Sequence, residues 1–158
     1  MRPMNTRLLV AVNGSEESYK ALTHAVTIAE EFGSELKIVT VVPTQYYCAN
    51  INESNHLDTI FFDVQDRLII VYKKVLAKAE AKIRSEYPDM NVNAILVEGR
   101  PSVKIVDLAE KERCDMIVVG RSPKISGIIG MILDWMEKST SNIVLDDSKV
   151  NVMVVAHS

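Results

Sequence analysis

Short apolar runs recur along the chain and are separated by stretches in which apolar residues follow a helical spacing. Each run has the length of a β-strand and few polar residues, which is typical of strands buried on both faces of a parallel sheet. Turn-forming residues close two of the runs: Asn13-Gly14 follows the first and Pro43 follows the second. Strands are therefore predicted at residues 8–12, 36–42, 92–97, 116–119 and 150–155.

Helices are predicted in the intervals between these strands. Ser15 is the N-cap candidate of the first helix, and Gly33 is its stop signal. Glu16 and Glu17 lie in its first turn, where the helix dipole favours acidic residues. The second helix must end before Pro88, because proline cannot continue a helix. The expected helices cover residues 15–32, residues 64 to 87, residues 103–113, and a segment with a polar start at residues 138–142.

The alternation of strands and helices indicates one α/β domain over residues 1–158. Such units place successive strands parallel, with right-handed crossovers. We expect an open, doubly wound, five-stranded parallel sheet of order 3-2-1-4-5 with helices on both faces. Ligands of such sheets bind beyond the carboxyl ends of the strands, where the strand order reverses. The turns at residues 13–15 and 120–122 are expected to meet at that point.

Two segments interrupt the alternation. Residues 44–63 are predicted to be a long loop, although the next helix has a possible early start at residues 57–62. Residues 124–136 are an apolar insert that includes Trp135. The insert either packs on the core of the domain, covers a pocket, or forms a contact between subunits, because an exposed apolar cluster of this size would mark an interface.

The composition narrows the classes of function. The chain has 158 residues and a formal net charge of −3, without a long basic cluster, so nucleic-acid binding is not expected. No apolar run reaches the roughly 18 residues of a membrane-spanning helix, so membrane insertion is not expected. The apolar stretch near the N-terminus is too short for a signal peptide. Cys48 and Cys114 have no CxxC spacing, which fits a protein of the reducing cytoplasm.

Catalytic motifs are not found in the sequence. The patterns HExxH, GxSxG and GxxxxGK[ST] do not occur, and the three histidines are isolated. Asn13-Gly14-Ser15-Glu16 also differs from the SGGxDS turn of adenylating enzymes. We expect no catalytic residues and at most a weak ATPase activity; a nucleotide hydrolase or an adenylating enzyme is the third hypothesis.

Several short motifs in order along the chain resemble those of the universal stress protein family. The first strand and turn, VAVNGSEES at residues 10–18, is similar to the family pattern AVDGSxxS. Residues 41–43 read VVP, residues 98–101 read EGRP, and residues 114–120 read CDMIVVG, each as in the family. Residues 152–155, VMVV, are similar to the last strand. The resemblance covers almost the whole chain.

The resemblance implies a fold of the adenine nucleotide alpha hydrolase-like kind and a regulatory role in the stress response. Members are usually homodimers paired through the last strand, which here is Val150 to Val155. Many bind ATP or AMP, with Mg²⁺ possible beside ATP, and others do not bind a nucleotide. The resemblance leaves the regulatory partner unknown.

The nucleotide motif of the family, G-x2-G-x9-G-[ST], is only partly kept. Gly120 matches the first glycine and Ser139 the hydroxyl residue, but Pro123 and Lys138 replace the other two glycines. Proline has no N–H to donate to a phosphate, whereas the lysine ammonium adds positive charge. A shifted alignment uses Gly127 and Gly130 with the hydroxyls that follow at residues 140–141.

Topology and resemblance together give a candidate nucleotide site. Asn13 stands where the family has aspartate, and its amide can still hydrogen-bond a ribose hydroxyl. Ser139 or Thr140 has a simpler interpretation as a helix N-cap. The alternative function is therefore a dimeric interaction module of the same fold that has lost its nucleotide site. The candidate residues are Ala11, Val12, Asn13, Val41 and Val119 around the base, and Gly120, Ser122, Ser139, Thr140 and Ser141 at the phosphates.

Overall fold

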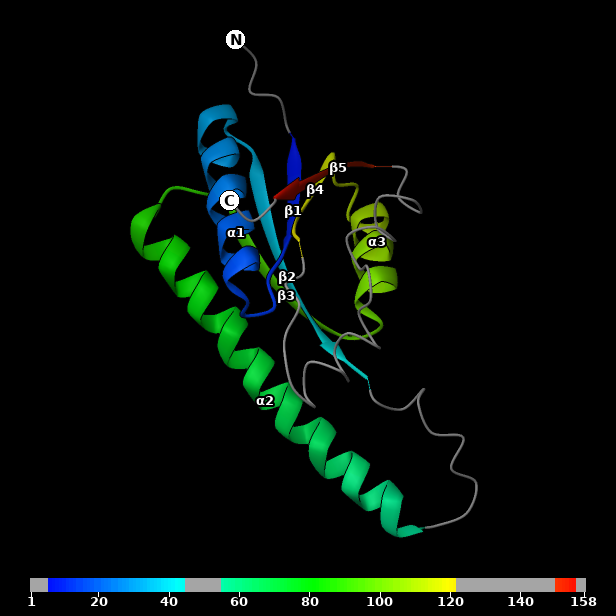
Figure 1. Cartoon of the computed structure of the whole chain (residues 1–158). Coiled ribbons are helices and arrows are strands. Elements are labelled where there is room, and N and C mark those ends of the chain that lie inside the picture. Colours follow the sequence, from blue (N-terminus) through cyan, green and yellow to red (C-terminus); the bar gives the residue numbers. More distant parts are fainter. Residues whose placement is uncertain (1–5, 45–54, 122–149, 156–158) are drawn as a thin grey trace.

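A computed structural model describes residues 6–44, 55–121 and 150–155, with the backbone alone for residues 55–62. Five parallel strands form one sheet of order β3-β2-β1-β4-β5 (Figure 1). The predicted α/β class and strand order are thereby confirmed. The strands are β1 (Arg7–Ala11), β2 (Glu35–Pro43), β3 (Val92–Gly99), β4 (Met116–Gly120) and β5 (Asn151–Val155).

Helices cover both faces of the sheet. The helices α1 (Glu16–Phe32) and α2 (Asn55–Glu86) lie on one face, and α3 (Pro101–Lys111) lies on the other (Figure 1). Their ends differ by one or two residues from the predicted ones, except at the start of α2. Within the part of the chain that is described, no helix is long and apolar enough to cross a membrane.

The ends of α1 follow the local sequence. The hydroxyl Oγ of Ser15 accepts a hydrogen bond from the backbone N–H of Ser18 at 3.1 Å, which satisfies one of the free donors at the helix start. Gly33 ends the helix in the left-handed conformation, with φ of 65°. Both predicted end signals are confirmed.

Alternation along the strands divides the core into two layers. In β1, Leu8 and Val10 pack into the cluster beneath α1 and α2, whereas Leu9 packs into the cluster beneath α3. All three side chains are buried, as expected for a central strand of a parallel sheet. The α3 layer also contains Cys114, whose thiol is buried. Burial raises the pKa of this thiol from its ordinary value of 9.0 to about 11, so Cys114 is poorly reactive near neutral pH.

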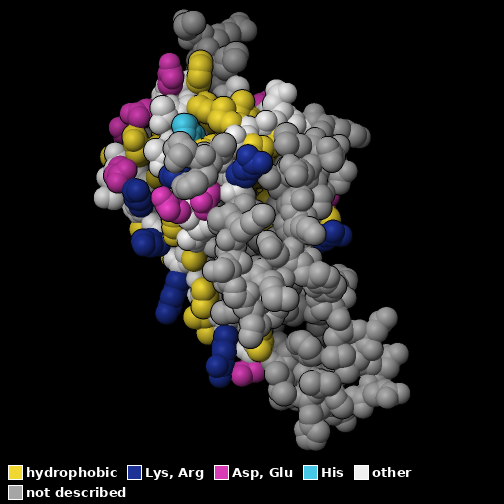
Figure 2. All heavy atoms as spheres, viewed as in Figure 1, with side chains coloured by type: hydrophobic (Ala, Val, Ile, Leu, Met, Phe, Trp, Pro, Cys, Tyr) yellow, Lys and Arg dark blue, Asp and Glu magenta, His cyan; other side chains and the backbone are white. Residues whose placement is uncertain are grey.

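The helix α2 begins earlier than the long predicted loop allows. It starts at Asn55, so the loop expected over residues 44–63 is wrong for its last part, and the early start around residues 57–62 is confirmed. Apolar residues at helical spacing continue upstream of Val64 and explain the extension. Apolar side chains reach the surface along this helix, next to charged ones (Figure 2). The insert at residues 124–136 and the helix expected from residue 138 lie outside the described residues.

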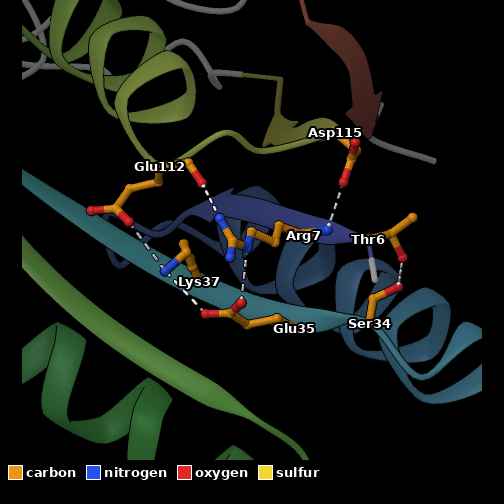
Figure 3. A network of polar contacts seen from close by, with 7 residues as sticks. All are labelled: Thr6, Arg7, Ser34, Glu35, Lys37, Glu112 and Asp115. Carbon is orange, nitrogen blue, oxygen red and sulfur yellow. Dashed lines mark hydrogen bonds and ion pairs between the residues drawn. The ribbon is translucent and has the colours of Figure 1, made fainter. Parts of the chain in front are cut away.

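A network of charges closes the amino-terminal edge of the sheet (Figure 3). Lys37 of β2 is only 4% exposed, and its ammonium lies 3.1 Å from a carboxylate oxygen of Glu35 and 3.4 Å from one of Glu112. Arg7 of β1 donates from Nε to Glu35 at 3.1 Å and from Nη1 to the carbonyl of Glu112 at 3.0 Å. The backbone N–H of Arg7 donates to Asp115 at 2.8 Å. These contacts join β1 and β2 to the segment between α3 and β4.

The network changes how Lys37 titrates. Burial lowers the pKa of Lys37, but the carboxylates of Glu35 and Glu112 outweigh burial and hold it above its ordinary value of 10.5. A buried cation with a raised pKa stabilises the folded state below the pKa of the unfolded chain, and this stabilisation disappears as pH rises through the folded value.

The free energy of unfolding is therefore expected to fall in two overlapping stages at alkaline pH. Between pH 9.0 and about 11 the protein loses up to about 2–3 kcal/mol of stability through Cys114. In this range the thiol is deprotonated in the unfolded chain but still protonated in the buried site, so unfolding becomes more favourable. Lys37 adds a further loss above pH 10.5. Urea unfolding from pH 7 to 11 measures both stages.

Two variants assign the two stages. Cys114→Ala should remove the first stage and leave the second in place. Lys37→Met should remove the second stage, and because the Lys37 ammonium lowers the pKa of Cys114, it should also extend the first stage to higher pH. A pH profile that neither variant changes would contradict this assignment.

Candidate functional site

The order of the strands reverses between β1 and β4. β1 pairs with β2 on one side and with β4 on the other, with Val10 opposite Val118. In sheets of this kind, the crevice that binds ligands lies at the carboxyl edge, between the two strands where the order reverses. The turn after Ala11 and the exit of β4 at Gly120 both lie at this edge, as predicted from the topology.

The turn after β1 is held by its own side chains. Asn13 is exposed, and its Oδ1 accepts a hydrogen bond from the N–H of Ser15 at 2.9 Å. The hydroxyl Oγ of Ser18 accepts from the N–H of Asn13 at 3.3 Å and donates to the carbonyl of Ser15 at 2.8 Å. Gly14 has φ of 89°, a conformation that favours glycine. Several donors that could bind a phosphate at the start of α1 are therefore already used.

Gly120 is required by close packing. A methyl group at this position would lie 2.5 Å from the carbonyl oxygen of Glu17 and 2.9 Å from the backbone nitrogen of Ser18. The first turn of α1 thus rests directly on the exit of β4. Gly120 was predicted as a phosphate-loop glycine, and the structure gives it a packing role that it has with or without a ligand.

The backbone and side chain of Val12 are also fully used in structural contacts. Its N–H donates to the carbonyl of Val39 at 2.9 Å, and its carbonyl accepts from the hydroxyl of Thr40 at 2.8 Å. Its side chain is buried in the layer beneath α1 and α2. Thr40 was not predicted from the sequence; the signal was a single hydroxyl within an apolar strand, since such a buried group needs a hydrogen-bond partner.

Three of the predicted base-lining residues share the α3 face of the sheet. Val41 and Val119 are buried in the cluster beneath α3, and Ala11 packs against the same cluster. Thr44 follows at the end of β2, and its N–H donates to the carbonyl of Gly99 at 3.3 Å. The hydroxyl of Thr44 is buried with no hydrogen-bond partner in the described part of the chain. This edge therefore combines an apolar floor with an unsatisfied polar atom.

Three basic residues follow the carboxyl ends of strands at this edge, two of them at the start of α3 and one after β4. Arg100 stands at the N-cap position, its side chain makes no capping bond, and the first turn contains no acidic residue. Lys104 packs its stem against the backbone at Gly99, where φ is 148°. Arg121 follows β4, and its N–H donates to the carbonyl of Val155 at 2.9 Å. Within the described residues, none of Arg100, Lys104 and Arg121 forms a salt bridge.

The two helix starts at this edge thus differ in charge. The first turn of α1 contains Glu16 and Glu17, whereas the start of α3 has Arg100 and Lys104. A helix N-terminus favours anions, and acidic side chains already satisfy that preference at α1. An anionic group would therefore be attracted to the α3 side of the crevice.

The remaining candidates cannot be placed. Ser122, Ser139, Thr140 and Ser141 lie outside the described residues, as does the insert. Among the described residues, no group of three or more His, Cys, Asp or Glu side chains could hold a metal ion. The site can thus be built from the described chain only as an apolar floor, a hydroxyl and three cations.

Comparison with known proteins identifies the family. The family model described as "Universal stress protein family" matches residues 4–156. The chain belongs to the universal stress protein family. Universal stress protein YxiE of Bacillus subtilis is 30% identical over 146 residues, covering 89% of this chain and 94% of that protein. Universal stress protein MJ0531 of Methanocaldococcus jannaschii is 26% identical over 149 residues, covering 94% of this chain and 81% of that protein.

Solved structures of universal stress proteins share the fold. UspA from Lactobacillus plantarum has a TM-score of 0.73 at 23% identity, over 96% of this chain and 97% of that chain. A universal stress protein solved in complex with cAMP has a TM-score of 0.63 at 23% identity, over 98% of each chain. A universal stress protein from Archaeoglobus fulgidus in complex with dAMP has a TM-score of 0.63 at 20% identity, over 95% of this chain and 97% of that chain.

The contact at Gly120 is testable by stability. Gly120→Ala is expected to lower the free energy of unfolding by about 2–3 kcal/mol, because the added methyl group forces α1 away from β4. Gly33→Ala is the matched control, since φ is 65° there but nothing lies within 4 Å, so only about 1 kcal/mol of backbone strain is expected. Urea unfolding of both variants measures the difference. A loss at Gly120 no larger than that at Gly33 would contradict the packing role.

Proposed function

We propose that this universal stress protein is a regulatory module that binds an adenine nucleotide, ATP or AMP, on the α3 side of the crevice between β1 and β4. The observation that carries the proposal is the apolar floor of Ala11, Val41 and Val119 at the same edge as cations that form no salt bridge within the described residues. The protein would respond to the nucleotide by binding it, without efficient catalysis. Mg²⁺ would accompany ATP and be held by its phosphates.

The floor suits a purine. Flat heterocycles gain free energy from apolar contact, and a few polar groups then fix their orientation. Ala11, Val41 and Val119 supply apolar surface from three adjacent strands. The hydroxyl of Thr44 supplies a donor and acceptor without a partner among the described residues. Asn13, whose Oδ1 is already bonded, would offer its amide nitrogen to a ribose hydroxyl.

Charge supports the position of the phosphates. Glu16 and Glu17 at the start of α1 would repel a phosphate, while Arg100, Lys104 and Arg121 would attract one. The cAMP and dAMP complexes of universal stress proteins of the same fold support an adenine ligand. From the sequence, Gly120, Ser122, Ser139, Thr140 and Ser141 remain the proposed contacts on the loop after β4.

Nucleotide binding is tested by thermal unfolding with ATP or AMP, with and without Mg²⁺. A ligand at about ten times its Kd adds about 1.4 kcal/mol and should raise the unfolding midpoint by about 3–5 °C. The double variant Arg100→Glu/Arg121→Glu should lose most of this increase, because both substitutions place negative charge beside the phosphates. Lys111→Glu, at the other end of α3, is the matched control and should keep it.

Two outcomes would change the assignment. No shift of the midpoint in the unsubstituted protein at millimolar ATP or AMP would overturn nucleotide binding. Equal losses in the double variant and in Lys111→Glu would overturn the position of the phosphates but not binding itself. Phosphate release above background would revive the hydrolase alternative.

A second candidate function is a dimeric interaction module, and the position of β5 favours it. β5 is the last strand of the sheet and pairs only with β4 among the described strands. The carbonyl of Val155 accepts from Arg121 on the β4 side. Because neighbouring residues of a strand direct their backbone groups to opposite sides, Val154 presents its N–H at the outer edge. An outer edge of this kind can pair with the same strand of a second copy.

Val154→Pro tests this edge. Proline removes the outward N–H and is tolerated on edge strands, so the variant is expected to be monomeric while the unsubstituted protein is a dimer. Val154→Ala is the matched control: it loses the same packing against the α3 layer but keeps the N–H, and it should remain dimeric. Sedimentation velocity measures the mass. A dimer that persists in Val154→Pro, or an unsubstituted protein that is monomeric, would exclude β5 as the interface.

A further inference from the structure

Within the described residues, the middle of α2 has an outer surface that packs on no other element. Its inner side packs on the sheet through Leu76, Ala79 and Ile83, which are buried. On the outer side, Ile70 is 56% exposed and Val71 is 55% exposed. Two large β-branched residues in contact with water do not stabilise the domain, since their burial would be favourable by roughly 1.5–3 kcal/mol each.

Charges are arranged in a definite order around Ile70. Asp66 lies one turn before it and Lys74 one turn after it, so the three residues follow one another along the same exposed side of the helix. Farther out, Asp63 lies on the acidic side and Lys78 on the basic side. Figure 2 shows apolar side chains at the surface along α2 with acidic and basic ones beside them.

We propose that this surface binds the same surface of a second copy of the chain, with the two α2 helices antiparallel and crossing at Ile70. A two-fold axis at Ile70 places Asp66 of each helix opposite Lys74 of the other, so the patch is complementary to itself. A parallel arrangement would instead place like charges together. Ile70 and Val71 of both copies would fill the centre, and the ion pairs would form the rim.

The other charges of the patch are compatible with this arrangement. Arg67 would come close to the basic half of the second helix, but its guanidinium already lies 3.3 Å from the carboxylate of Asp63 on its own helix. Lys78 lies over the ring of Tyr19 of α1, with the ammonium 6.0 Å from the ring centre. The central ion pairs are therefore those between Asp66 and Lys74. The surface belongs to α2 and is separate from the outer edge of β5, and this proposal does not depend on the proposed function.

A charge swap in the full-length protein tests the pairing. Asp66→Lys or Lys74→Asp alone places like charges opposite each other and should weaken the association by at least about tenfold. The double variant Asp66→Lys/Lys74→Asp restores opposite charges and should recover the association of the unsubstituted protein. The two residues are about 12 Å apart along one helix, so recovery can only come from contact between copies. Sedimentation equilibrium across a range of concentrations measures each association constant.

Cross-linking tests the crossing point independently of any contact through β5. In a Cys48→Ser background, Ile70→Cys should form a disulfide between copies under mild oxidation, because each residue 70 faces its counterpart. Val103→Cys on α3 is the matched control: valine is 44% exposed there, and no cross-link is expected. The remaining Cys114 is buried. Failure of the double charge variant to recover association, or equal cross-linking at positions 70 and 103, would overturn the proposal.

Discussion

The contact between the exit of β4 and the first turn of α1 determines what the carboxyl edge of the sheet can do. At Gly120 there is no room for a side chain, because the carbonyl of Glu17 occupies that space. The turn that connects β1 to α1 is fixed at the same time by hydrogen bonds among Asn13, Ser15 and Ser18. The start of α1 is therefore part of the packing of the sheet. The backbone N–H groups of Asn13, Ser15 and Ser18 are already hydrogen-bonded within the protein.

This constraint moves the expected ligand to the other face. In many doubly wound proteins the helix after β1 binds the phosphate. Here that helix starts with Glu16 and Glu17, while the positive charge belongs to Arg100, Lys104 and Arg121. The apolar floor of Val41 and Val119 faces the same way as these cations, beneath α3. The buried apolar residues and two of the three cations thus lie on the α3 side, although the sequence motif drew attention to the loop after β4.

The sequence predicted the fold better than it predicted the roles of individual residues. Uninterrupted apolar runs and capping residues such as Ser15 and Gly33 depend on local chemistry, so strand order and helix ends could be deduced from them. The packing role of Gly120 could not, because it depends on a helix about a hundred residues earlier in the chain. The same holds for Thr40, whose partner is a carbonyl on the neighbouring strand. The spacing of apolar residues along the sequence indicates which side chains are buried, but it does not indicate which backbone groups of other elements they contact.

The two ends of the sheet also show why charge alone does not identify a site. At the amino edge, the ammonium of Lys37 lies beside the carboxylates of Glu35 and Glu112, and the guanidinium of Arg7 contacts Glu35 and the carbonyl of Glu112. Such a network joins strands, and its contribution to stability is lost at alkaline pH when Lys37 loses its proton; its charges are already paired with one another. At the carboxyl edge, cations of the same kind form no salt bridge within the described residues. An anion that binds there only when the protein is folded would pair with these cations, and because it binds the folded state alone, it would stabilise the fold.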